Sequence, residues 1–181
     1  MKKILIVFGR LLDFIYYFLL GGVAAARRKG VRVGENSRIY IWQFNDEPFL
    51  ISIGSRTTVT GGVRLLTHDG STSLVRNAEG YRYQRYGRIS IGNDVFVGMN
   101  SIIMPGVTIQ SRVVVGAGSV VTKDVPEGTV VAGNPARPLM DFESFRRKIE
   151  QTCPNDKELE AAVNYKERVK LALSIISTKG N

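Results

Sequence analysis

The chain of 181 residues contains one histidine and one cysteine. A lone cysteine, Cys153, cannot form an intrachain disulfide, which suits a reducing compartment. One imidazole and one distant thiol are also too few for a zinc or iron site, because such sites use several of these ligands. We therefore expect no metal centre. Cys153 has no histidine near it in sequence, so we do not expect it to act as a nucleophile.

Acidic residues are scarce, with 16 Asp and Glu against 25 Lys and Arg, and the formal net charge is +9. This excess points to an anionic partner such as a membrane surface, an anionic cofactor or nucleic acid. The sequence has no recognised DNA- or RNA-binding motif, and its basic residues are dispersed along the chain. We therefore do not expect nucleic acid as a partner.

A long uninterrupted apolar run is missing as well. Residues 1–30 are apolar with basic flanks, but Arg10 and Asp13 leave fewer than the ~20 apolar residues of a typical membrane span. No convincing signal-peptidase site precedes the rest of the chain. Two interpretations stay open. The segment is either a helix lying at a membrane surface or a helix packed on the base of the following domain.

The central part of the chain has a six-residue period. Aliphatic residues recur at this spacing, and four residues after each stands a small or β-branched residue. The first set is Ile91, Val97, Ile103, Ile109, Val115 and Val121, and the second is Val95, Ser101, Val107, Val113, Ser119 and Val125. Such a period is typical of a parallel β-helix, in which short strands need inward residues and their corners need small ones. We predict an all-β core of this kind over residues 31–140.

The six-residue period is interrupted twice. Ile39 and Ile53 are two residues further apart than two hexads, which predicts a bulge around residues 43–48. The interval between Leu65 and Ile91 is several times longer than one hexad, which predicts an excursion over residues 67–88. Long excursions from a compact repeat are commonly functional, and insertions tend to collect on one binding face. We therefore look for chemistry at these two places.

Residues 141–181 are polar and have helical patterning. Phe142, Phe145 and Ile149 share one helical face, Pro154 and Asn155 end that helix, and a second helix is predicted from Glu158 to Ser177. We expect this segment to cover the open end of the coil or a neighbouring subunit, because exposed strand edges at the end of a repeat structure need a cap.

The single histidine, His68, stands where the excursion begins, in Leu65-Leu66-Thr67-His68-Asp69-Gly70. A neutral imidazole is the natural general base for a hydroxyl or an amine. Asp69 either orients this imidazole or belongs to an Asp-Gly turn, and the turn is favoured. The excursion is rich in arginine and tyrosine: Arg76, Arg82, Arg85, Arg88, Tyr81, Tyr83 and Tyr86. Such a set suits a ring-shaped or anionic substrate, although a solvated charged loop is the alternative.

Longer motifs point to one family. They are Ile91-Gly92-Asn93-Asp94-Val95-Phe96-Val97-Gly98, Met104-Pro105-Gly106-Val107-Thr108-Ile109, Val115-Gly116-Ala117-Gly118-Ser119-Val120-Val121-Thr122-Lys123-Asp124-Val125-Pro126 and Ala132-Gly133-Asn134-Pro135-Ala136-Arg137. Through them the chain resembles the hexapeptide-repeat acyltransferases, whose fold is a left-handed parallel β-helix. The resemblance is to the branch with maltose, galactoside and nodulation-factor acetyltransferases and the O-acetyltransferases of polysaccharide gene clusters.

This resemblance implies a site and a mechanism. His68 matches the general base, which acts without an acyl-enzyme intermediate, and acetyl-CoA lies between neighbouring coils of a homotrimer, with active sites between subunits. The positions matching cofactor contacts are Met99, Ala117, Thr122, Lys123 and Arg137, although Met99 is bulkier than the usual residue there. The candidate acceptor-binding residues are Asn45 and Asp46 in the bulge, beside Gln43, and Asp69, Tyr83 and Arg85 in the excursion.

The expected function is O-acetylation of a sugar hydroxyl in a bacterial surface polysaccharide or its precursor. We expect a cytoplasmic protein, peripheral on the inner face of the membrane if residues 1–29 contact lipid. Two alternatives stay open. The acceptor is an antibiotic or amino sugar, modified on nitrogen or oxygen, or the protein is a non-catalytic trimeric scaffold.

Overall fold

The computed structural model describes residues 2–179, so residue 1 and residues 180–181, at the ends of the two predicted terminal segments, lie outside the described part. The chain divides between Leu139 and Met140 into two compact units. The first unit contains the N-terminal helix and the coil, and the second contains the C-terminal helices. Each unit is described by itself below.

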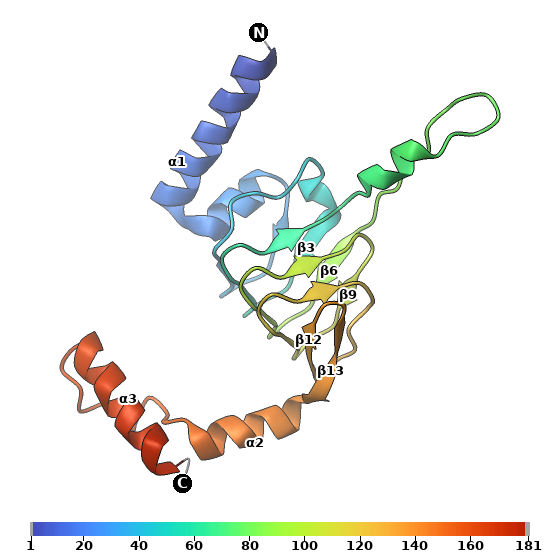
Figure 1. The fold of residues 1–181 in the computed structure, drawn as a ribbon. Helices are drawn as coiled ribbons and strands as arrows, with labels where there is room; N and C mark the ends of the chain where they lie inside the picture. Colours follow the sequence, from blue (N-terminus) through green and yellow to red (C-terminus); the bar gives the residue numbers. More distant parts are fainter. Residues whose placement is uncertain (1, 180–181) are drawn as a thin grey trace. The chain divides into compact units, whose positions relative to one another are not determined.

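The first unit is a coil of short parallel strands in three sheets (Figure 1). The sheet orders are β1-β3-β6-β9, β13-β12-β10-β7-β4-β2 and β11-β8-β5. The strands are β1 (Arg32–Val33), β2 (Arg38–Ile39), β3 (Ile51–Ile53), β4 (Thr58–Val59), β5 (Arg64–Leu65), β6 (Ile89–Ile91), β7 (Phe96–Val97), β8 (Ile102–Ile103), β9 (Thr108–Ile109), β10 (Val114–Val115), β11 (Val120–Val121), β12 (Thr129–Gly133) and β13 (Ala136–Asp141). From β3 to β11, successive strands lie in different sheets, so each turn of the coil has three sides, whereas β12 and β13 are neighbours in one sheet.

Each regular turn of the coil is three hexads long, as shown by the parallel pairing of Ile91 with Ile109 and of Val97 with Val115. Both predicted sets of hexad residues are buried, and the aliphatic set fills the interior of the coil. Ser101 and Ser119 are buried at a corner, where both hydroxyls donate to the carbonyl oxygen of Gly116. Each buried hydroxyl therefore has a hydrogen-bond partner, as buried polar groups require. The predicted left-handed parallel β-helix is confirmed.

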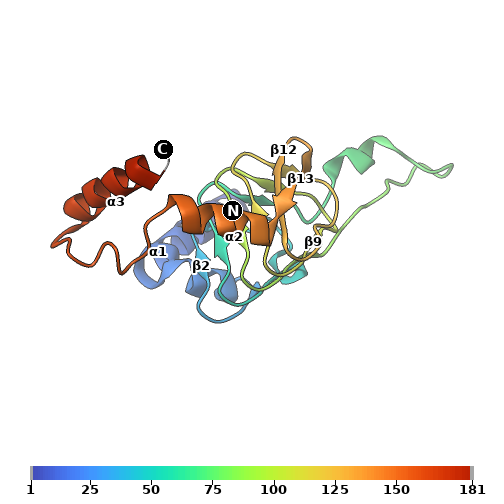
Figure 2. The ribbon, with the colours of Figure 1, turned by 90° about the horizontal axis from the view of Figure 1, so that it is seen from below.

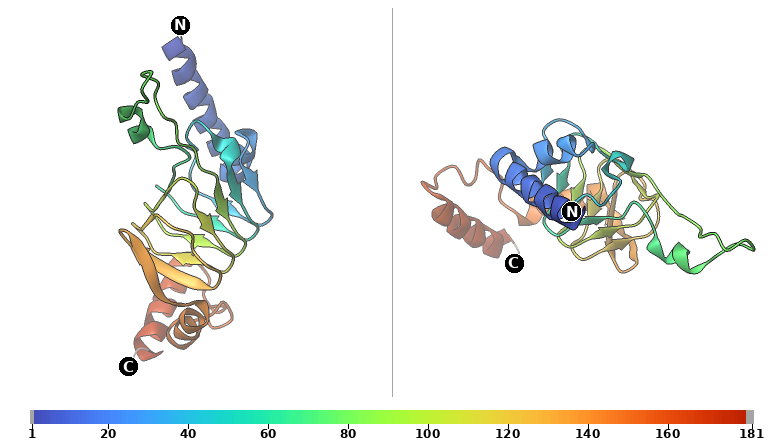
Figure 3. Two further views of the ribbon diagram at one scale, coloured as in Figure 1. Left: turned by 90° about the vertical axis from the view of Figure 1, so that its right-hand side faces the viewer. Right: turned by 90° about the horizontal axis from the view of Figure 1, so that it is seen from above.

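Both interruptions of the six-residue period lie where the spacing of the aliphatic residues predicted them. The first coil is two residues longer than three hexads, since Ile39 pairs with Val59, and the lengthened segment between β2 and β3 contains a short 3-10 helix, η1 (Pro48–Leu50). The excursion contains a second one, η2 (Gly70–Leu74), and projects away from the coil (Figure 2; Figure 3, left). At its base, the Gly87 amide donates to the Thr67 carbonyl at 2.8 Å. This bond lets the excursion leave and re-enter the coil at one point.

The predicted N-terminal helix is present as α1 (Lys2–Arg28), which bends at Gly21. Gly21 has φ +81°, a conformation that glycine adopts without strain. After the bend, Gly22 lies so close to the coil that a Cβ there would be 1.8 Å from the Ile39 carbonyl oxygen. Ala25 and Ala26 are buried against the coil. No helix in the described part of the chain is both long and apolar enough to cross a membrane.

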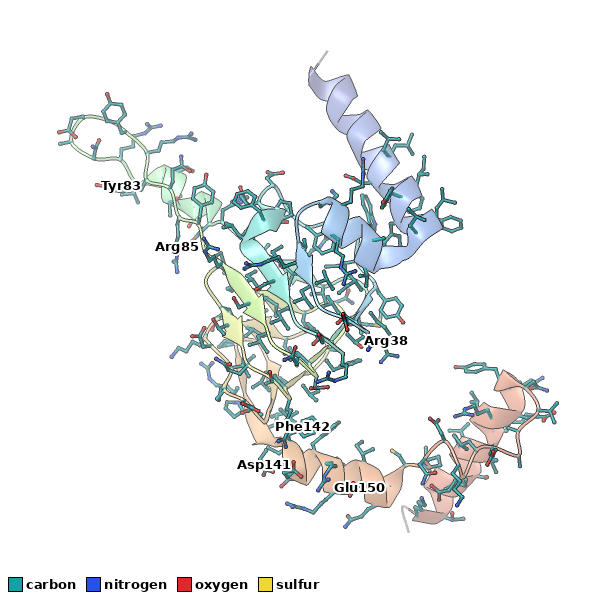
Figure 4. All side chains as sticks on the ribbon, turned by 180° about the vertical axis from the view of Figure 1, so that it is seen from behind. Arg38, Tyr83, Arg85, Asp141, Phe142 and Glu150 are labelled. Atoms are coloured by element: carbon teal, nitrogen blue, oxygen red, sulfur yellow. The ribbon has the colours of Figure 1, made fainter. Side chains whose placement is uncertain are left out.

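The second unit contains α2 (Phe142–Thr152) and α3 (Tyr165–Lys179). Asp141 caps α2 by accepting a hydrogen bond from the Ser144 amide at 2.7 Å (Figure 4). The predicted start of the second helix at Glu158 is wrong, because the chain is not helical from there to Asn164. Asn164 and Glu167 form a reciprocal cap that starts the helix at Tyr165. The covering role of this unit stays a prediction.

Candidate active site

The two interruptions of the coil meet at the corner where β5 ends. Because the first coil is two residues longer than a regular one, Glu47 in the bulge lies above Thr67 in the next coil. One carboxylate oxygen of Glu47, Oε2, accepts a hydrogen bond from the Thr67 hydroxyl at 2.7 Å and contacts His68 Nδ1 at 2.9 Å. Thr67 is fully buried, so its hydroxyl gives the carboxylate a fixed anchor.

The protonation states of Glu47 and His68 depend on each other. The hydrogen bond with the Glu47 carboxylate raises the pKa of His68 above its ordinary value, and the charges of Glu47, Asp46 and Asp69 act in the same direction. Partial burial opposes this shift. In turn, hydrogen bonds from His68 and Thr67 lower the pKa of Glu47. At neutral pH Glu47 is therefore ionised and acts as an acceptor for the imidazole.

This arrangement fixes which ring nitrogen can act as a base. With ionised Glu47 accepting at Nδ1, the neutral imidazole has its proton on Nδ1 and its lone pair on Nε2. The side chain of His68 keeps 40% of its surface exposed, whereas Glu47 keeps 17%. An accessible base, oriented by a more buried carboxylate, is the arrangement needed to remove a proton from a hydroxyl.

Two cavities meet at His68. The larger, of about 780 Å³, is lined by Gly9, Asp13, Lys29, Trp42, Gln43, Phe44, Asn45, Asp46, Arg64, Leu66 and His68. The smaller, of about 360 Å³, lies towards the excursion and is lined by Asp46, Glu47, His68, Asp69, Gly70, Thr72, Ser73, Arg82, Gln84, Arg85 and Tyr86. His68 and Asp46 belong to both. An acceptor bound in either cavity would thus have access to the imidazole.

Most of the predicted acceptor-binding residues line these cavities. Asn45 and Asp46 border the larger one, and the Asn45 amide donates to the Leu65 carbonyl at 2.9 Å. Asp69 and Arg85 border the smaller one. The Asp69 carboxylate accepts from the amide and hydroxyl of Ser71, so it belongs to the favoured Asp-Gly turn, and Glu47 orients His68 instead.

Tyr83 lies apart from the other candidates. Its side chain is 54% exposed, and it stands further out on the excursion than Arg85, which is nearer the base (Figure 4). Tyr86, which was predicted only as part of the aromatic set, has its ring 6.3 Å from the His68 ring in an edge-to-face contact. Within the excursion, the residues nearest to His68 are therefore those next to the coil.

Thr122 and Lys123 share a corner with His68. Strands β5, β8 and β11 are paired in register, with Leu65 beside Ile103 and Ile103 beside Val121. The residues that follow these strands are therefore stacked, and Thr122-Lys123 lies two coils from Leu66-Thr67, or roughly 10 Å at the usual strand spacing. Both side chains are exposed. A cation at this distance suits the phosphate end of an extended ligand.

The other predicted cofactor residues lie elsewhere on the coil. Met99 and Ala117 follow β7 and β10, and the Met99 carbonyl accepts from the Gly118 amide at 2.7 Å. These two residues therefore lie on adjacent coils at a second corner. Arg137 belongs to β13, at the end of the long sheet. Within one chain, the five residues are therefore distributed over two corners of the coil and its last strand.

Glu47 was missed by sequence reasoning, although the signal was present. The interval between Ile39 and Val59 gives the length of the first coil, and the same interval counted back from Thr67 ends at Glu47. Among residues 2–179, no group of three or more His, Cys, Asp and Glu side chains is placed to hold a metal ion.

Comparison with known proteins identifies the family. The profile described as bacterial transferase hexapeptide (six repeats) matches residues 88–123. Protein CapG of Staphylococcus aureus is 45% identical over 145 residues, which are 78% of this chain and 81% of CapG. The galactoside O-acetyltransferase of Escherichia coli (strain K12) is 37% identical over 98 residues, 53% of this chain and 46% of that protein.

The solved structure of a maltose O-acetyltransferase from Clostridium difficile 630 has the same coil. It is 33% identical, with a TM-score of 0.52, over 62% of this chain and 59% of that one. The fold, the six-residue repeats and the long match to CapG agree with the resemblance drawn from the motifs. The chain belongs to the hexapeptide-repeat transferases and is an acetyltransferase of that family.

Proposed function

We propose that the protein is an acetyl-CoA-dependent O-acetyltransferase that acts on a sugar hydroxyl of a bacterial surface polysaccharide or its precursor. The observation behind this proposal is the pair of Glu47 and His68 at the junction of two cavities. Two similar proteins named as sugar O-acetyltransferases support a sugar acceptor. The apolar, cation-flanked N-terminus supports an acceptor made at a membrane.

In the proposed reaction, Nε2 of His68 takes the proton of the acceptor hydroxyl as its oxygen attacks the acyl carbon. Glu47 stabilises the resulting imidazolium, because its carboxylate already accepts from Nδ1. The imidazolium then returns the proton to the departing sulfur, so no covalent enzyme intermediate is needed. General-base catalysis of this kind contributes about 10²- to 10⁴-fold to a rate.

The cofactor residues fit acetyl-CoA in two groups. Thr122 and Lys123, on the corner of His68, would meet the phosphates, while Met99 and Ala117 would meet the pantetheine arm from a second copy. When bound, acetyl-CoA supplies an acetyl group activated as a thioester. We propose a homotrimer on this basis, since the two groups lie on different corners of one chain.

The direct test is thiol release from acetyl-CoA with a panel of sugars, nucleotide sugars and polysaccharide fragments. We expect release that requires one class of sugar acceptor, with a product whose new bond is an oxygen ester. An amide product, or turnover only with an antibiotic, would replace the sugar hydroxyl by the alternative acceptor. Absence of acetyl-CoA binding would contradict the enzyme and favour the scaffold.

A first prediction concerns Glu47→Gln. Glu47 raises the pKa of His68, and only the neutral imidazole is a base, so wild-type activity should fall as the pH drops through this raised pKa. In Glu47→Gln the pKa of His68 returns towards its ordinary value, and the acidic limb of the kcat/KM profile should move to lower pH. The plateau should fall by at least about tenfold, because the imidazole is no longer oriented.

The control for this prediction is Asp69→Asn. Asp69 also raises the pKa of His68, but as the last of the contributors, and its carboxylate is bonded to Ser71. We expect the acidic limb to move less in this variant than in Glu47→Gln. Profiles measured between pH 5 and 9 would contradict the role of Glu47 if both variants moved equally.

A further inference from the structure

Helix α1 consists of two parts with different surroundings. Beyond the bend at Gly21, its last turns are fixed to the coil by the close approach of Gly22 and the burial of Ala25 and Ala26. Before the bend, the helix runs away from the coil (Figure 1). We call residues 11–20 the outer segment. The fixed second part determines where the outer segment leaves the body of the unit.

The outer segment has its polar side inward. Asp13 forms ion pairs with Lys29 at 2.6 Å and Arg28 at 3.1 Å, and the Arg28 guanidinium lies 4.9 Å from the centre of the Tyr16 ring. A helix that simply packs on a domain has the opposite arrangement, with its apolar stripe against the core and its charges in water. Apart from the contact of Phe14 with Trp42, packing on the coil therefore does not explain the apolar residues of the outer segment.

Most apolar side chains of the outer segment are exposed, although the Phe14 ring also makes an edge-to-face contact with Trp42 of the coil at 5.8 Å. The leucine, isoleucine and phenylalanine side chains of this segment are all at least 40% exposed, with Phe18 and Leu19 at 79% and 71%, whereas Tyr16 and Tyr17 are partly buried. The exposed residues are Leu11, Leu12, Phe14, Ile15, Phe18, Leu19 and Leu20. A contiguous apolar surface of this kind marks a site of contact with a partner or a membrane.

The charge of the N-terminal segment favours a membrane over a protein as the partner of this apolar surface. Residues 1–32 contain seven basic residues and one acidic residue, and therefore six of the nine net positive charges of the chain. Asp13 is shared by two cations, and Arg27 donates to the carbonyl oxygens of Val33 and Gly34, so its charge is not neutralised there. An exposed apolar face beside an excess of cations matches the surface of an anionic bilayer.

We propose that the outer segment of α1 docks the protein on an anionic lipid bilayer. The same helix contributes Gly9 and Asp13 to the wall of the cavity that includes His68, so docking places this cavity at the membrane. On the basis of the proposed function, the acceptor is then a sugar attached to a membrane lipid. Lys29 and Arg64, which also line the cavity, match an anionic group in such a linkage.

The docking step is tested by co-sedimentation of the full chain with vesicles, without acetyl-CoA or acceptor. We expect wild type to pellet with vesicles of phosphatidylcholine and phosphatidylglycerol (3:1), and to bind at least tenfold more weakly to pure phosphatidylcholine or in high salt. Phe18→Ser/Leu19→Ser should lose at least tenfold in binding to the anionic vesicles. The matched control is Leu74→Ser/Val75→Ser, an equally adjacent exposed pair on the excursion, which should bind as wild type.

Two results would overturn the docking proposal. One is a wild type that stays in the supernatant with anionic vesicles, and the other is a Phe18→Ser/Leu19→Ser variant that binds as well as wild type. If wild type ignores vesicles and this variant lowers the molar mass in light scattering, the apolar face is covered by a second copy instead. Because this assay needs no turnover, its outcome is independent of the proposed function.

The acceptor step is tested separately, with the acceptor from the panel supplied either free or anchored in the same vesicles by an alkyl chain. We expect Phe18→Ser/Leu19→Ser to act on the anchored acceptor at least tenfold more slowly than wild type. On the free acceptor, the two proteins should have equal rates. Equal rates on both forms would show that docking does not deliver the acceptor.

Discussion

Replacing His68 by alanine is expected to lower kcat about a thousandfold, within the 10²- to 10⁴-fold range of general-base catalysis. The expectation rests on the contact of Nδ1 with Glu47, which leaves the lone pair of Nε2 for the acceptor hydroxyl. Binding of CoA should not change, because the predicted phosphate contacts at Thr122 and Lys123 lie two coils away. Steady-state kinetics and calorimetry with CoA measure the two quantities.

Imidazole added to the His68→Ala protein supplies a matched control. The cavities at His68 are open, so a free imidazole has access to the vacated position and should restore part of the activity. Rescue by imidazole but not by a buffer base excluded by size would support a base at this position. Retention of most of the wild-type kcat in His68→Ala would show that His68 is not the base.

The second large effect is on stability. Ile103 is fully buried in β8, the middle strand of the sheet whose corner holds His68. Ile103→Ala should reduce the free energy of unfolding by about 3 kcal/mol, because removing buried methyl groups leaves a cavity that a rigid coil fills poorly. Denaturant-induced unfolding at one fixed protein concentration measures this loss, since association would otherwise alter the midpoint.

Ile102→Ala is the matched control, as it makes the same chemical change at the adjacent position of the same strand. Its side chain faces outward and is only partly buried. We expect this variant to lose less than about 1 kcal/mol. Equal losses from the two variants would contradict the assignment of Ile103 to the interior and Ile102 to the outer face.

The coil itself could be predicted from the sequence because its period is short and each repeat has the same physical requirements. Ile91, Val97 and Ile103 had to be inward, and the deviations at Ile39–Ile53 and Leu65–Ile91 located both irregular segments. The position of His68 at the base of the excursion followed directly. These predictions required only the spacing of residues along the sequence.

Other features were not predicted, because they depend on contacts between particular side chains or on the conformation of one glycine. Glu47 and His68 are far apart in the sequence, and they meet only because the first coil is two residues longer than the regular ones. The bend at Gly21 gives the two parts of α1 different surroundings, so packing on the coil describes the part after the bend, while contact of the earlier part with a membrane stays a prediction. The start of α3 depended on the Asn164 cap, which interrupts a pattern that looks continuously helical.

The closed base of the excursion bears on how this enzyme could change its specificity during evolution. Hydrogen bonds from Gly87 to Thr67 and from Asp69 to Arg85 hold the two ends together, and β6 pairs with β3 as if no insertion were present. Residues between these bonds can therefore be lengthened, shortened or exchanged without shifting the frame of the β-helix. A lineage could acquire a new acceptor by replacing this segment while keeping Glu47 and His68 in place.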